Sequence, residues 1–311
     1  MRDQFVKTLT EIAAREPRTM LITGDLGFGV LTDFARRFPK QYVNAGVAEQ
    51  NMTALAAGLA LEGRQVFTYS IGNFPTLRCL EQIRNDVCYH GCDVKIVSVG
   101  GGFSYGVLGM SHHATEDLAI MRALPNMICV VPGTLWEAAE ATRAVAALRT
   151  PCYLRLDKSQ ADAAPADGER FTLGRARQLR DGDAITLVAA GGILQEALDA
   201  ADALAQRGLR CRVLSMHTIK PLDRDALERA ARETGGIVTV EEHNIVSGLG
   251  GAVAEACLES GVRPRRFLRI GLDDRYSEVV GDQQYLRAAY GMHSAAIVAK
   301  VAALLEGGAG A

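Results

Sequence analysis

Glu49 is the side chain in this sequence with the clearest capacity for proton chemistry. It stands where a short strand, residues 42–44, passes into a helix built mainly from Ala, Gly, Leu and Met. A carboxylate at such a junction is either an exposed first-turn charge that complements the helix dipole or a buried functional acid. Composition favours the exposed charge, whereas burial would favour the protonated form and make Glu49 a proton carrier near neutral pH. Composition alone leaves both interpretations open.

Two other patterns suggest nucleotide or metal binding, but their spacing is wrong. The turns at 24–29 and 248–251 are rich in Gly and precede helices, yet neither has the spacing of the dinucleotide fingerprint. Cys88, His90 and Cys92 could ligate zinc, but no second ligand pair follows at zinc-finger spacing. We therefore expect no metal ligands in this chain and do not favour a nucleotide-dependent oxidoreductase.

Alternating strands, helices and Gly-rich turns must position these side chains. This alternation is typical of parallel α/β architecture. In the first half, strands are expected at 19–23, 42–44, 65–69, 94–99, 126–131 and 152–156, with helices between them. Past residue 170, strands are expected at 184–190, 211–216, 237–241 and 267–270. The segment between, 159–170, is rich in Ala, Asp and Pro without apolar periodicity, which predicts a linker.

The sequence thus predicts two α/β domains with mainly parallel sheets, residues 1–158 and 171–311, joined by the linker 159–170. The 34 Lys and Arg residues nearly balance the 36 Asp and Glu residues, so the net charge is −2. Such a balance gives no electrostatic footprint for nucleic acid or an anionic membrane. The N-terminus lacks the apolar run of a signal peptide, and the longest uncharged stretch, 96–115, contains many Gly residues. We expect a soluble, cytoplasmic protein.

Four separated segments carry a family resemblance. GVAEQNM, EQIRNDV, GMSHHATEDLAIMRALPNM and VTVEEHNIVSGLGGAV resemble the C-terminal half of transketolase. Similar segments occur in the related deoxyxylulose-phosphate synthases and in the β subunits of 2-oxo-acid dehydrogenases. The resemblance covers nearly the whole chain. It implies a pyrimidine-binding domain followed by the transketolase C-terminal domain, both α/β.

The resemblance also implies a cofactor and a partner. Family members use thiamine diphosphate, and a further domain with a GDG…NN motif binds the diphosphate and Mg²⁺. That motif does not occur in this sequence. The chain therefore resembles one subunit of a split transketolase. We expect a diphosphate-binding partner that carries the Mg²⁺ ligands, an α2β2 assembly and self-dimerisation of this chain.

Three residues would hold the cofactor if the resemblance is followed position by position. Glu49 matches the glutamate that hydrogen-bonds the 1′ nitrogen of the aminopyrimidine and favours its imino tautomer. Phe74 falls where the family places an aromatic side chain against the pyrimidine ring. The alternative is a core Phe beneath a loop. Asp25 matches an Asp near the cofactor, and its alternative is an ordinary turn residue.

Substrate contacts are implied at four further positions. His112 matches a histidine that hydrogen-bonds the sugar and can move protons, whereas its neighbour His113 is expected to point away. Arg155, in YLRLDK, matches the arginine that binds the sugar phosphate, and a surface ion pair is its alternative. Arg78 and Arg2 are weaker candidates for the same anionic end of the substrate.

Leu108 departs from the family pattern. Transketolases have there an Asp that reads the hydroxyl next to the carbonyl, and Leu cannot accept a hydrogen bond. The substrate could therefore be a deoxy, modified or less hydroxylated sugar, or a pyruvate-like donor. The expected activity is transfer of a two-carbon ketol unit between sugar-like, phosphorylated substrates. The alternatives are a 2-oxo-acid dehydrogenase β subunit, an acyloin or deoxyxylulose-type synthase subunit, and a non-catalytic regulatory subunit.

Overall fold

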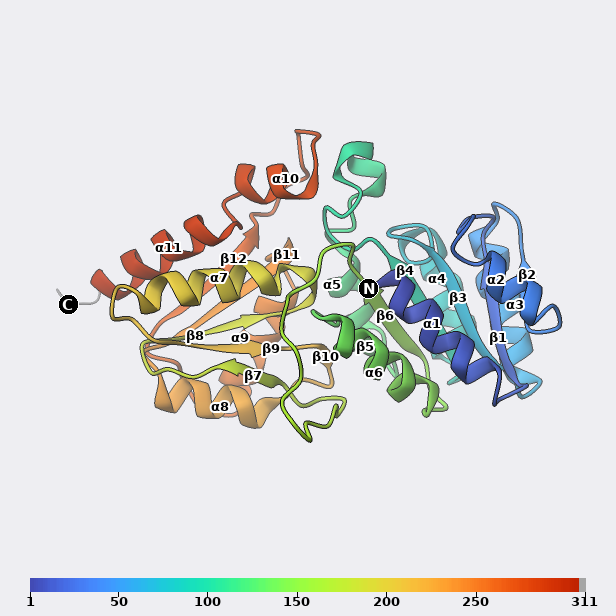
Figure 1. Ribbon diagram of the computed structural model, residues 1–311, viewed down its shortest axis with the longest axis horizontal. Helices are drawn as coiled ribbons and strands as arrows, with labels where there is room; N and C mark the ends of the chain where they lie inside the picture. Colours follow the sequence, from blue (N-terminus) through green and yellow to red (C-terminus); the bar gives the residue numbers. More distant parts are fainter. Residues whose placement is uncertain (308–311) are drawn as a thin grey trace.

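The first half of the chain forms one large sheet. The computed structural model describes residues 1–307 and has two α/β units side by side (Figure 1). The first sheet has seven strands in the order β10-β5-β6-β4-β3-β1-β2. Its parallel strands are β1 (Thr19–Thr23), β2 (Tyr42–Asn44), β3 (Gln65–Ile71), β4 (Val94–Val99), β5 (Ile128–Val130) and β6 (Cys152–Leu156). Strand β10 (Thr218–Lys220) lies antiparallel to β5.

Helices cover both faces of this sheet. One face packs against α1 (Arg2–Ala13), α2 (Thr32–Arg37) and α6 (Leu135–Ala146), which bury an apolar core with Phe5, Phe34 and Phe67. The other face packs against α3 (Glu49–Leu61) and α5 (Asp117–Ala123). That second core continues into the other unit through Val188, Leu214 and Val253. The two units therefore share buried apolar surface, which is the main favourable term in their association.

The second unit has five strands in the order β12-β11-β8-β9-β7. They are β7 (Arg177–Arg180), β8 (Ile185–Ala189), β9 (Cys211–Ser215), β11 (Ile237–Asn244) and β12 (Phe267–Leu272), and only β7 is antiparallel to its neighbour. Its helices are α7 (Leu194–Ala205), α8 (Arg224–Glu233), α9 (Leu249–Glu259), α10 (Gln283–Ala289) and α11 (Ser294–Glu306). The prediction of two α/β domains with mainly parallel sheets is confirmed. The last four residues of the predicted C-terminal domain, 308–311, lie outside the described residues.

Several elements differ from the sequence prediction. Strands β7 and β10 and helix α11 were not expected, and β10 joins the sheet of the first unit although it follows the linker. The helix expected between the strands at 65–69 and 94–99, whose pattern covers 77–89, is broken into η1 (Leu77–Cys79), α4 (Leu80–Gln82) and the π-helix η2 (Ile83–Cys88). Such breaks shift the helical register and are frequent at functional sites. Arg78 lies in the first of these turns.

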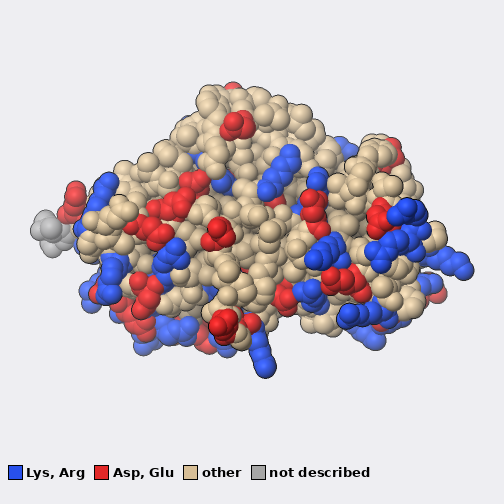
Figure 2. All heavy atoms as spheres, viewed as in Figure 1, with Lys and Arg blue, Asp and Glu red and all other residues tan. Residues whose placement is uncertain are grey.

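One apolar stretch passes a simple test for a membrane span. Residues 283–306 are long and apolar enough by length and composition. They form two helices, α10 and α11, separated by a turn at 290–293. Leu286, Ile297 and Val301 from this stretch are buried in the core of the second unit. Figure 2 shows charged side chains over both units, with few along the upper edge above α10.

Arg177 of the second unit forms ion pairs with both the first unit and the predicted linker. The linker, 159–170, contains no helix or strand. From β7, Arg177 donates to the buried Glu137 of α6 at 2.8 Å and to Glu169 of the linker at 2.6 Å. The Glu137 side chain is fully buried, so this ion pair compensates a charge that has no contact with water.

Replacing Arg177 by Met should therefore lower the free energy of unfolding by about 3–5 kcal/mol, because Glu137 would be left as an unpaired buried charge. The matched control is Arg180→Met, at the last residue of β7. The Arg180–Asp202 pair is about half exposed, and its loss should cost about 0–1 kcal/mol. Urea unfolding of the three proteins at neutral pH makes the comparison. Equally small losses of unfolding free energy in both variants would show that the burial of Glu137 does not require Arg177.

Candidate active site

The predicted site residues meet at one edge of the first sheet. Asp25 follows β1, Glu49 begins the helix after β2, Phe74 follows β3, and His112 lies in the long loop after β4. These strands are parallel, so their carboxyl ends lie together. In open α/β sheets ligands bind outside the carboxyl ends of the strands.

Glu49 is a buried acid. It is the first residue of α3 and is only 3% exposed, so the interpretation as an exposed first-turn charge is wrong. Its Oε2 accepts a hydrogen bond from Arg78 Nη1 at 2.8 Å, while Oε1 receives none from residues 1–307. A Cβ placed on Gly24 would lie 3.3 Å from Glu49 Cγ and 3.5 Å from Oε1. A side chain at position 24 would thus contact the Glu49 carboxyl group on its Oε1 side.

Phe74 and His112 form the next part of the site. Their ring centroids are 5.2 Å apart in an edge-to-face arrangement. Phe74 is half-buried, which does not match the alternative of a core Phe. The Arg78 guanidinium lies 4.5 Å from the centroid of the Phe74 ring. Arg78 therefore lies beside Glu49 and Phe74, the residues predicted to hold the cofactor, and its predicted contact with an anionic substrate end stays a prediction.

The loop between β4 and α5 holds His112 in a half-buried position. Ser111 Oγ lies 3.0 Å from His112 Nδ1. Partial burial lowers the pKa of His112 below 6.5, and the neighbouring His113 lowers it further. The His113 ring is buried, with Nε2 3.1 Å from the carbonyl oxygen of Gly106. His113 thus turns away from the site, as expected.

Tyr105 and Lys158 continue this row of side chains, and the sequence reasoning missed both. The Tyr105 ring lies 6.3 Å from that of His112, and Lys158 Nζ lies 3.6 Å from the Tyr105 centroid. Partial burial lowers the pKa of Lys158, and Arg2 lowers it further. Tyr105, Lys158 and Arg2 line a cavity of about 210 Å³, together with Asp157 and with Asp3, which pairs with Arg2 at 2.8 Å. The available signal was a lysine just past a predicted strand at the same sheet edge.

Arg155 requires a correction. Its side chain is only 1% exposed, and its Nε lies 3.2 Å from Asp117 Oδ2. Its Nη2 donates to the carbonyl oxygens of Ala114 and Glu242 at 3.2 and 2.9 Å. The guanidinium is therefore enclosed by its own chain and is not placed to bind a sugar phosphate. It is also not the surface ion pair of the alternative interpretation.

Asp25 is held by its own turn. It is exposed and has φ +55°, a left-handed conformation that Asp tolerates better than most residues. Its N–H donates to Asn44 Oδ1 at 3.0 Å, and Asn44 Nδ2 donates to Asp25 Oδ1 at 2.9 Å. The same Asn44 oxygen accepts the N–H of Gly46. This pair fixes two turns near Glu49, and contact of Asp25 with a cofactor stays a prediction.

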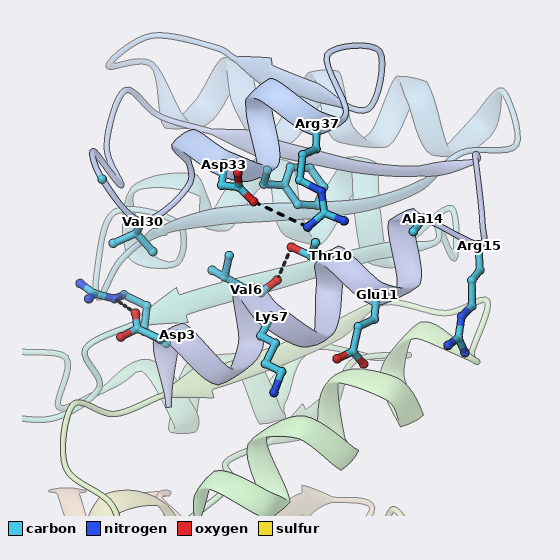
Figure 3. Close-up of a pocket in the computed structure, with 13 residues that line it drawn as sticks. Asp3, Val6, Lys7, Thr10, Glu11, Ala14, Arg15, Val30, Asp33 and Arg37 are labelled. Carbon is cyan, nitrogen blue, oxygen red and sulfur yellow. Dashed lines mark hydrogen bonds and ion pairs between the residues drawn. The ribbon is translucent and has the colours of Figure 1, made fainter.

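A larger hollow lies elsewhere. A cavity of about 790 Å³ lies between α1 and α2, and of the predicted site residues only Arg2 borders it. Figure 3 shows Asp33 and Arg37 paired on the α2 side and Thr10 bonded to the backbone of Val6 in α1. Positive and negative side chains alternate along the walls of this cavity. Among residues 1–307, no three His, Cys, Asp or Glu side chains are grouped to hold a metal ion.

The comparisons with known proteins decide the family. Residues 1–162 match the pyrimidine-binding domain of transketolase, and residues 174–297 match the transketolase C-terminal domain. The chain belongs to the transketolase family. It has both domains of a transketolase C-terminal section, as the resemblance implied.

Two relatives and one solved structure match this family member along nearly their whole length. A subunit of the apulose-4-phosphate transketolase of Phocaeicola vulgatus is 38% identical over 94% of this chain and 93% of its own. A 6-deoxy-6-sulfo-D-fructose transketolase subunit of Clostridium sp. is 36% identical, with 96% and 92% covered. A split-gene transketolase, solved as an inactive β4 tetramer, is 36% identical with a TM-score of 0.86 and 98% and 97% covered.

We predict that His112 titrates below 6.5 because partial burial disfavours its charged form. His113→Gln should raise the pKa of His112, since it removes a nearby charge of the same sign. Histidine NMR of the isotope-labelled protein gives both values. His90→Gln, an exposed histidine outside this row, is the control and should leave the His112 titration unchanged. A His112 pKa at or above 6.5 would contradict the placement described here.

Proposed function

We propose that this chain is the C-terminal catalytic subunit of a split transketolase. It would transfer a two-carbon ketol unit between sugar-like substrates that end in an anionic group, with thiamine diphosphate and Mg²⁺. The observation that carries the proposal is the buried Glu49 carboxyl, with one oxygen bonded to Arg78 and the other without a hydrogen-bond partner among residues 1–307, and with Phe74 and His112 next in the row.

The residues at this edge fit one end of thiamine diphosphate. Glu49 Oε1 is available to a ring nitrogen, and Arg78 on Oε2 fixes the orientation of the carboxyl group. Phe74 offers a half-buried aromatic edge that would orient a pyrimidine ring. When bound, thiamine diphosphate supplies the stabilisation of carbanion character needed to break the carbon–carbon bond next to a ketone. In that setting Glu49 would share a proton with the ring nitrogen.

The other end of the cofactor would belong to a partner. The GDG…NN motif is absent from this sequence, and no metal-ligand cluster occurs within residues 1–307. A diphosphate-binding subunit with the Mg²⁺ ligands would therefore complete the site, in an α2β2 assembly in which this chain also contacts its own copy. The description of the relatives as transketolase subunits and the inactivity of the β-only tetramer support this arrangement.

Distances along the row suggest how a substrate would lie. The reacting carbonyl would be near Glu49 and Phe74, His112 would hydrogen-bond and move protons at the middle, and Lys158 with Arg2 would meet the anionic end. This pair replaces Arg155 in that role. The phosphate of apulose-4-phosphate and the sulfonate of 6-deoxy-6-sulfo-D-fructose, in the names of two relatives, support an anionic terminus.

Leu108 bears on the rest of the substrate. Its side chain is exposed in the loop that carries His112, with Val107 and Met110 exposed beside it. An apolar group there favours a substrate with fewer hydroxyls at the facing carbon, since a hydroxyl would lose its hydrogen bonds with water. Turnover of pyruvate in place of a ketose phosphate would instead support the alternative of an acyloin or deoxyxylulose-type synthase subunit.

Glu49→Gln should reduce kcat of the assembled complex by about 10²–10⁴-fold, the range for a positioned proton-transfer group. The donor is whichever of D-fructose 6-phosphate, 6-deoxy-6-sulfo-D-fructose and hydroxypyruvate the wild-type complex turns over fastest, with an aldose phosphate as acceptor. The control is Glu62→Gln, an exposed acid at the other end of α3, which should retain wild-type rates. Full turnover by Glu49→Gln would support the non-catalytic alternative.

Lys158→Met should raise KM for D-fructose 6-phosphate about 10–100-fold, since a hydrogen bond to a charged group is worth about 1.5–3 kcal/mol. KM for D-fructose, which has no anionic end, should change little. Lys7→Met on the outer side of the same domain is the matched control. Equal changes in KM for both sugars would remove Lys158 from the anion site.

A further inference from the structure

The motif VTVEEHN, residues 238–244, has no part in the chemistry proposed above, yet it touches the loop that carries His112. Glu242 lies in β11 of the second unit and is only 1% exposed. Its Oε1 accepts the N–H of Phe103 at 2.6 Å, at the start of that loop. Its Oε2 accepts a hydrogen bond from Arg287 of α10, whose side chain is also 1% exposed.

The loop backbone is shaped around this carboxylate. Gly102 and Ala114 exchange two backbone hydrogen bonds of 2.8 and 2.9 Å, which close the base of the loop. Gly102 has φ +57°, and a Cβ there would overlap Glu242 Oε1. Only glycine allows both the conformation and the contact. The loop base therefore lies directly on the Glu242 side chain.

Helix α10 provides a second support. Gln283 Nε2 donates to Glu242 Oε1 at 2.8 Å and lies 3.4 Å from Ser104 Oγ in the loop. A Cβ on Gly106 would overlap the carbonyl oxygen of Gly281, so the first turn of the loop also packs against the second unit. Figure 1 shows this part of the loop standing next to α10.

The far end of the loop is tied to the same strand. Arg155 Nη2 donates both to the carbonyl oxygen of Ala114 and to that of Glu242. The Phe103 ring packs between His113, at 5.1 Å, and Tyr290 of the second unit, at 5.7 Å. The Glu242 carboxylate has hydrogen bonds on both oxygens, and buried polar groups that are fully bonded rigidify what they hold. Both ends of the loop are thus fixed to β11, while His112 lies between them.

We propose that Glu242 is a positioning residue for His112, through which the C-terminal domain takes part in the reaction without touching the substrate. The proposal rests on the role of His112 given above. Glu242 is bonded to Phe103, Gln283 and Arg287 at once, so its carboxyl has no alternative position without leaving a buried charge unpaired. A displacement of about 1 Å in a reacting group can cost about 10²-fold in rate.

A double-mutant cycle in the assembled complex tests the proposal. Glu242→Gln keeps the shape of the side chain but weakens its hold on Phe103 and Arg287. It should lower kcat/KM about 10–100-fold with His112 present, with unchanged affinity for thiamine diphosphate because Glu49 is untouched. In the His112→Asn background the same change should cost no more than about twofold, since a residue acting through His112 has nothing left to position.

Two further variants guard against a purely structural effect. Glu196→Gln is the matched control, because Glu196 is also buried beside Arg287, at 3.6 Å, but bonds Ser294 and not the loop. It should keep wild-type kcat/KM. If Glu242→Gln fails to fold, Gln283→Met takes its place in the test. It removes a donor to Glu242 without removing a charge, and it should lower kcat/KM by a smaller factor than the one expected for Glu242→Gln.

Equal loss from Glu242→Gln in both backgrounds, or equal loss from Glu196→Gln, would overturn the proposal. A different result is expected if the role proposed for His112 in catalysis is wrong. In that case the His112→Asn variant would keep wild-type turnover. Histidine NMR separates the two cases, because Glu242→Gln should shift the His112 imidazole resonances whatever His112 does in catalysis. Unchanged resonances would overturn the positioning role on their own.

Discussion

A carboxyl group buried at the start of a helix needs compensation, and the arrangement of the site follows from that constraint. Glu49 is nearly fully buried, so it requires the Arg78 hydrogen bond on one oxygen and leaves the other for a ligand. Arg78 in turn lies against the face of Phe74, which packs on His112. Successive contacts therefore connect the buried Glu49 of α3 with His112 in the loop after β4.

The same constraint joins the two domains. Arg155, Asp117 and Asp157 of the first unit and Glu242 and Arg287 of the second are all buried and lie in one network of ion pairs and hydrogen bonds. Burial raises the pKa of Asp157, which shows how costly its charge is at this junction. Charges of this kind hold the elements that carry them, because moving one partner away would leave another buried charge unpaired.

Much of the fold could be predicted because buried parallel strands are continuous apolar runs. Strands β1, β4 and β6 begin and end at the predicted residues. Strand β10 was not predicted, since it follows the linker and pairs antiparallel with β5 of the first unit, a contact that no local pattern shows. Residues 77–89 have a helical pattern, yet the structure divides them into a 3₁₀ turn, a short α-helix and a π-helix, which the pattern does not distinguish.

The sequence predicted which residues form the site better than it predicted what each of them does there. Sequence brought out Glu49, Phe74 and His112, which the fold then placed together. Glu49 begins α3 at a position where composition favoured an exposed charge, and only the packing of the folded chain makes it buried. Arg155 and Lys158 are three residues apart in one segment, and only the fold decides that the first is enclosed and the second faces a cavity.

The central claim is that this chain forms one part of a thiamine diphosphate site and that a second polypeptide completes it. Native mass spectrometry of the tagged protein, purified gently from its host, tests that claim most directly. We predict an assembly containing a second, different polypeptide with a GDG…NN motif and bound thiamine diphosphate. An assembly of this chain alone, without cofactor even when thiamine diphosphate and Mg²⁺ are supplied, would contradict the account.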